Sequence, residues 1–74
     1  MKRYLSNKAL DEVAQLYNYA MDEKEKATQL NVKEYFGGKV FGIIDTLAVA
    51  TESPWTVAEH FLNQRRLALK KAAS

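Results

Sequence analysis

The chain has no cysteine, one histidine, one proline and three glycines among its 74 residues. Without cysteine it can form neither disulfides nor thiolate metal sites, and one histidine cannot build a His-rich site. Asp45 interrupts the longest apolar stretch, so no segment approaches the roughly 20 apolar residues that a membrane span requires. We therefore expect residues 1–74 to form a single cytoplasmic domain that does not enter the membrane.

The residue patterns that carry catalysis are also missing. His60 follows Glu59, but no motif places a serine or cysteine nucleophile beside this pair. The glycines are not spaced as a phosphate-binding loop, and the chain has no H-E-x-x-H or paired-carboxylate signature. We expect a protein that is not an enzyme, needs no cofactor and has no evident small-molecule ligand.

Apolar residues recur at helical spacing in three segments, which predicts a compact all-α domain with helices over residues 6–28, 32–50 and 54–71. The expected first residues or caps are Ser6 or Asn7, then Asn31, then Ser53 or Thr56. The apolar stripes comprise Ala9, Leu10, Val13, Leu16, Tyr17, Ala20, Met21 and Ala27; Val32, Phe36, Val40, Ile43, Ile44, Leu47 and Ala50; and Trp55, Ala58, Phe61, Leu62, Ala68, Leu69 and Ala72.

The glycine pair Gly37-Gly38 allows a different interpretation of residues 34–41. Two glycines between aromatic and β-branched residues are also typical of a tight hairpin turn, which would make the fold α+β. An isolated hairpin of two strands is marginally stable in water. We therefore favour a helix over residues 32–50 and keep the hairpin as the alternative.

The second predicted helix has one bulky apolar side and one side that is nearly bare. Gly38 and Gly42 lie on the bare side with Val49, in a G-x-x-x-G pattern that permits close helix packing. Either another helix of the same chain packs against these glycines, or a partner subunit does. The second possibility predicts a protein interface, in a homodimer or with another protein. Its residues are Tyr35, Gly38, Phe41, Gly42 and Val49.

The first predicted helix offers a second contact surface. Glu12 and Glu23 flank Tyr19 on its acidic side. An exposed tyrosine is a common anchor in protein interfaces, and the neighbouring carboxylates suit a basic partner surface. Our first hypothesis is therefore a small helical module that binds a protein partner or self-associates as a dimer.

The basic third segment supports an alternative hypothesis, a helix-turn-helix DNA-binding regulator. Its candidate DNA contacts are Asn63, Gln64, Arg66, Lys70 and Lys71. Against it, the turn holds Glu52 and the first helix is acidic. Arg65 falls within the apolar stripe, where we expect its stem to pack on the core or its charge to pair with a carboxylate such as Asp45.

In composition the chain resembles the short, cysteine-free helical proteins that phages and other mobile elements of bacteria encode. The resemblance extends loosely over the chain and includes no diagnostic motif. It implies a protein that works by binding, often to one host or viral protein.

Overall fold

The computed structural model describes residues 3–73 and consists of three α-helices joined by short connections. They are α1 (Asn7–Lys26), α2 (Leu30–Thr51) and α3 (Trp55–Ala73). The all-α, three-helix prediction is confirmed. The hairpin alternative is wrong, because residues 34–41 lie inside α2 and continue its helical hydrogen bonding.

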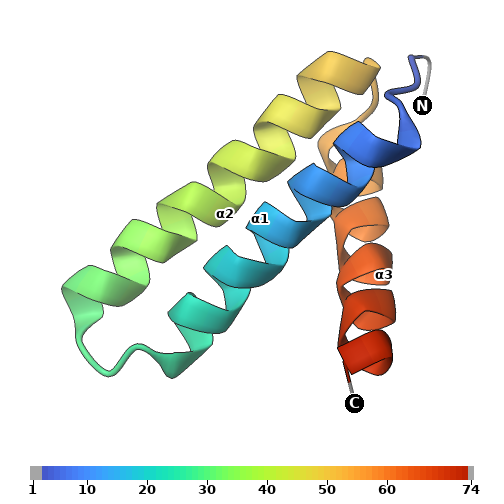
Figure 1. Cartoon of the computed structure of the whole chain (residues 1–74). Helices are drawn as coiled ribbons and strands as arrows, with labels where there is room; N and C mark the ends of the chain where they lie inside the picture. Colours follow the sequence, from blue (N-terminus) through green and yellow to red (C-terminus); the bar gives the residue numbers. More distant parts are fainter. Residues whose placement is uncertain (1–2, 74) are drawn as a thin grey trace.

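α1 and α2 form an antiparallel pair, and α3 starts behind α1 and runs at an angle to the pair (Figure 1). α3 contacts both helices of the pair. The chain therefore has two layers, with α3 covering one face of the α1–α2 pair. The opposite face of that pair is not covered by α3 and carries an apolar groove.

The helix starts follow from local hydrogen bonds; the predicted start was correct for α1, one residue too early for α3 at position 54, and wrong for α2. Ser6 caps α1, since its hydroxyl accepts the backbone N–H of Ala9 at 3.1 Å. The prediction of Asn31 as a cap is wrong, because α2 begins one residue earlier, after Gln29. Thr56 lies inside α3 and cannot cap it.

The end of α2 is fixed by a left-handed residue. Glu52 has φ 51° and ψ 47°, a conformation that costs about 1–2 kcal/mol in a residue with a Cβ atom. The N–H of Ser53 donates to the carbonyl of Ala48 at 2.9 Å, as in a Schellman motif. This reversal turns the chain sharply from α2 into α3.

The core lies where the three helices meet. Thr51 is fully buried among the apolar core residues. Its hydroxyl donates to the carbonyl of Leu47 at 2.7 Å, so its polar atom has a hydrogen-bond partner. Three of the buried residues, Ala14, Ala48 and Thr51, lie outside the predicted stripes. The buried apolar residues are Leu10, Ala14, Tyr17, Ala20, Val40, Ile44, Leu47, Ala48, Ala58 and Leu62.

Three residues of the predicted stripes, Leu16, Ala68 and Ala72, are exposed and do not belong to the core. Leu16 leaves 60% of its surface exposed, although it recurs at the helical spacing of the buried residues of α1. It lies at the edge of that stripe, on the side of α1 turned away from α3. Neither α2 nor α3 covers this side, which is why Leu16 faces solvent.

Candidate protein-binding surface

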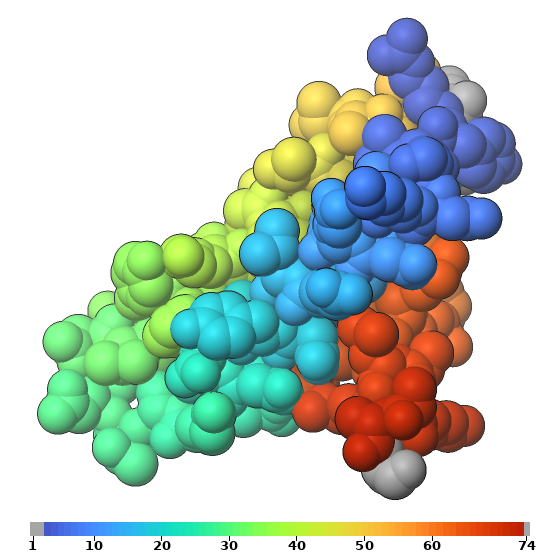
Figure 2. All heavy atoms as spheres, viewed as in Figure 1, coloured from blue at the N-terminus to red at the C-terminus, as the bar shows by residue number. Residues whose placement is uncertain are grey.

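An apolar groove runs between α1 and α2 on the face of the pair opposite α3. Figure 2 shows α1 (blue to cyan) and α2 (green to yellow) side by side on this face. The groove has a volume of about 570 Å³ and is open to solvent. We call it the α1–α2 groove; it is lined by Leu5, Val13, Leu16, Tyr19, Ala20, Lys39, Gly42, Ile43, Thr46, Leu47 and Ala50.

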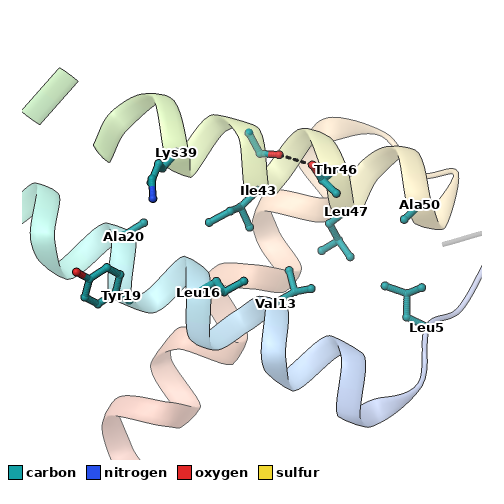
Figure 3. A pocket seen from close by; sticks show the side chains of 11 residues that line it. Leu5, Val13, Leu16, Tyr19, Ala20, Lys39, Ile43, Thr46, Leu47 and Ala50 are labelled. Atoms are coloured by element: carbon teal, nitrogen blue, oxygen red, sulfur yellow. Dashed lines mark hydrogen bonds between the residues drawn. The ribbon is translucent and has the colours of Figure 1, made fainter. Parts of the chain in front are cut away.

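The lining of the groove offers few polar groups to a ligand. The hydroxyl of Thr46 donates to the carbonyl of Gly42 at 2.7 Å, so it is already occupied (Figure 3). The polar side-chain groups that remain are the ammonium of Lys39 and the hydroxyl of Tyr19. Among the described residues that line the groove, none carries a carboxylate. An occupant must therefore supply mainly apolar contacts.

Two of the predicted interface residues meet in this groove. Tyr19 is 57% exposed on α1, and Gly42 lies on α2 on the other side of the groove. Leu16, which was not predicted as an interface residue, stands next to them. Its exposure depends on which side of α1 is covered by α3, and helical spacing alone does not show this.

The glycines face open space. A Cβ atom placed on Gly38 or Gly42 would meet no atom within 4 Å. The expectation that another helix of the same chain packs against them is therefore wrong. A smaller hollow of about 380 Å³ adjoins the groove through Thr46 and reaches Val49, which is 79% exposed. The bare side of α2 is a free surface within residues 3–73.

The remaining predicted interface residues lie around this surface. Tyr35 is 58% exposed and carries the ammonium of Lys39 at 5.1 Å from its ring centre. Phe41 is equally exposed, but it stacks on Trp55 at 5.6 Å and so lies on the side of α2 next to the start of α3. Phe41 therefore does not border the groove.

The predicted acidic contacts lie on the groove side of α1. Glu12 is exposed, and Glu23 is half-buried and lies 3.4 Å from the ammonium of Lys26. By helical spacing, Glu12, Leu16, Tyr19 and Glu23 share one narrow strip along α1. We call this strip the α1 ridge.

The basic residues of α3 are directed at the other side of α1. Arg66 pairs with Asp22 at 2.9 Å and with Glu25, and Lys70 pairs with Asp22 at 2.8 Å. The bonds to Lys70 and Arg66 hold the pKa of the Asp22 carboxyl below its ordinary value of 3.8. We call this set of four residues the α1–α3 clasp.

Other polar residues of α3 take part in the same contact. Asn63 accepts a hydrogen bond of 2.5 Å from the hydroxyl of Tyr17, and burial raises the pKa of that phenol. Arg65 pairs with Asp11 at 2.9 Å, so Asp45 was the wrong carboxylate to expect. Gln64 and Lys71 are exposed on α3. Three of the five candidate DNA contacts, Asn63, Arg66 and Lys70, thus hold α3 onto α1.

Within residues 3–73 no cluster of histidine and acidic side chains has the composition to hold a metal ion. In the same range no helix is both long enough and apolar enough to cross a membrane. Comparisons of this chain with protein family models, with curated proteins and with solved structures gave no match.

Proposed function

We propose that the protein is a small, non-enzymatic interaction module of the cytoplasm that binds another polypeptide in the α1–α2 groove. The observation that carries the proposal is the groove itself, with exposed Leu16 and Tyr19 on one side and the unshielded Gly42 on the other. Exposed apolar surface that is continuous and partly concave is typical of protein-binding sites.

The shape of the groove favours a helical segment as the occupant. Two antiparallel helices leave a furrow between them that accepts the ridge of a third helix, and amphipathic helices bind in such furrows through residues spaced three and four apart. At Gly42 the backbone of α2 is bare, so an incoming helix can approach closely there. Tyr19 offers a large, rigid contact of the kind that dominates interface energies.

The DNA-binding alternative has weaker support. Arg66 and Lys70 already have carboxylate partners on α1, so binding phosphates through them would require breaking the clasp. Phosphate neutralisation by basic side chains is the main source of nonspecific DNA affinity. DNA binding through α3 is therefore disfavoured, because its basic side chains already hold α3 onto α1.

The proposal can be tested with a photo-crosslinking amino acid introduced at Leu16 in the cells that encode the protein. The matched control places the same amino acid at Leu67, which is 55% exposed on α3 and lies outside both hollows. We expect light-dependent adducts from position 16 and few or none from position 67.

The masses of the adducts identify the type of occupant. A product of twice the chain mass indicates self-association, and a larger product indicates a different protein. Adducts that form equally from both positions, or no adduct from position 16, would contradict the proposed binding surface. Adducts should also become weaker when Tyr19→Glu is added, because this substitution puts a charge into the apolar groove.

A further inference from the structure

We infer that the occupant of the α1–α2 groove is a second copy of this chain. The two copies are related by a two-fold axis parallel to α1 and α2, so that α1 of each copy lies along α2 of the other. This inference rests on the proposed function, because it names the polypeptide that binds the groove. It follows from the register, the shape and the charges of the two helices.

The helices α1 and α2 pack against each other in a defined register. Figure 3 shows Lys39 opposite Ala20, and Leu47 opposite Val13. The Cε atom of Lys24 lies 4.0 Å from the position of a Cβ on Gly37, which agrees with this alignment. A residue of α1 and a residue of α2 therefore lie at the same level along the helix axes when their numbers add up to about 60. A two-fold axis parallel to the helices leaves these levels unchanged in the partner.

A strip of α2 faces outward beside the α1 ridge. By helical spacing it consists of residues separated by four and three positions, and we call it the α2 ridge. Its members are all exposed. In order they are Tyr35, Lys39, Gly42, Thr46 and Val49.

The side chains of the two ridges fit together in the inferred dimer. At the register given above, the partner's Leu16 falls between Gly42 and Thr46, and the partner's Tyr19 falls between Lys39 and Gly42. Each side chain of one ridge thus enters a gap of the other, as in knobs-into-holes packing. The missing side chain at Gly42 provides the space that these two large residues need.

The two ridges carry opposite charges. The α1 ridge carries Glu12 and Glu23, whereas the only charge on the α2 ridge is that of Lys39. In the inferred dimer the partner's Glu23 lies between Tyr35 and Lys39, within reach of the lysine. A two-fold axis perpendicular to the helices would instead place α1 against α1 and bring Glu12 close to the partner's Glu23. Repulsion of like charges across an interface opposes that arrangement.

The area of the surface is sufficient for a dimer. Twenty residues of helix are about 30 Å long. Two helices packed about 10 Å apart present a face about 20 Å wide, or roughly 600 Å² per copy. The total of roughly 1,200 Å² lies at the lower end of the range for specific interfaces. A dimer that dissociates at low concentration is the expected result.

The first experiment exchanges charges between two chains. The inferred homodimer contains two symmetric contacts between positions 23 and 39. Glu23→Lys places two lysines at each contact, and Lys39→Glu places two glutamates there. Each substitution should therefore raise the dissociation constant, measured by sedimentation equilibrium, by about tenfold or more. An equal mixture of the two variants restores both opposite-charge contacts in the heterodimer. Its dissociation constant should return to within about threefold of the unmodified chain. Glu34→Lys, an equal charge change on an exposed residue outside both ridges, should leave the dimer unchanged.

The second experiment uses the absence of cysteine, which makes introduced thiols unambiguous. The Leu16→Cys chain mixed with the Thr46→Cys chain should give a disulfide-linked dimer under mild oxidation. Each variant alone should give little, because the two copies of position 16 lie diagonally across the bundle, beyond the Cα separation of about 4.4–6.8 Å that a disulfide spans.

The results separate the dimer from the proposed function. A monomer at every concentration, no recovery in the mixed variants, or rapid crosslinking of the Leu16→Cys chain alone would overturn the inferred dimer. If light-induced adducts at position 16 then contain a different protein, the groove is still a binding site and only its occupant was misidentified. If no adduct forms either, the proposed function fails as well.

Discussion

Replacing Gly42 by leucine should strengthen the fold of the isolated chain and abolish its self-association. Glycine inside a helix costs about 0.8–1.0 kcal/mol relative to alanine, and leucine is close to alanine in helix propensity. A Cβ at Gly42 meets no atom within 4 Å, so the first atom of the new side chain has no steric cost, and its outer atoms extend into the open groove. We expect the free energy of unfolding of the monomer to rise by about 0.7 kcal/mol.

The assay is urea denaturation followed by circular dichroism, at a concentration where sedimentation shows only monomer. A gain of this size corresponds to an increase of roughly 3–5 °C in the melting temperature of a domain this small. At high concentration, sedimentation should show dimers of the unmodified chain but none of Gly42→Leu, because the new side chain fills the gap that the partner's Leu16 would enter.

Gly38→Ala is the matched control for this experiment. Gly38 has the same open surroundings, but it lies beside the α2 ridge and not on it. It should stabilise the monomer by about 1 kcal/mol and leave association intact. Destabilisation of the monomeric Gly42→Leu chain would refute the reasoning, since it would mean that a segment of the same chain packs against position 42.

Four further predictions concern the fold. Leu62→Ala should lower the free energy of unfolding by about 2–5 kcal/mol in urea titrations, because Leu62 is fully buried. Glu52→Gly should raise it by about 1 kcal/mol by relieving the left-handed backbone, and a lower urea midpoint would contradict this. Arg66→Met should cost about 1–2 kcal/mol, and added salt should reduce the difference from the unmodified chain. Because the folded pKa of Asp22 is depressed, its contribution is complete above its ordinary pKa of 3.8 and is lost as pH falls through the folded value. A pH series of urea midpoints should show this loss, and Asp22→Asn should remove it.

The helices and the bare side of α2 were predictable because they depend on local properties. The hydroxyl of Ser6 and the apolar spacing of α1 act over a few residues, and the start of that helix was predicted correctly. The sequence places Gly38 and Gly42 opposite the bulky side of their helix. Their exposure was not predictable, because another helix of the same chain could have covered them. Asn31 misled the prediction of the start of α2, because a suitable cap residue does not by itself stop a helix from extending further.

The candidate site was only partly predictable. Tyr19 and Gly42 were both expected at an interface, but nothing in the sequence indicated that they line the same groove. That depends on the alignment of α1 with α2. Arg65 shows the same dependence, since its position in the apolar stripe suggested a buried charge but not that Asp11 would be its partner.

The sequence by itself determined three amphipathic helices, the lack of thiol chemistry and a side of α2 without bulky residues. Helical periodicity fixes these features, because it decides which side chains share a face. Only the tertiary structure decided which faces are covered: α3 crosses one face of the α1–α2 pair, holds it through the clasp and leaves Leu16 in the open groove on the other. The physical reason is that covering a face depends on how whole helices cross and align, and contacts between residues more than 40 positions apart, such as Asp22 with Arg66, set that arrangement.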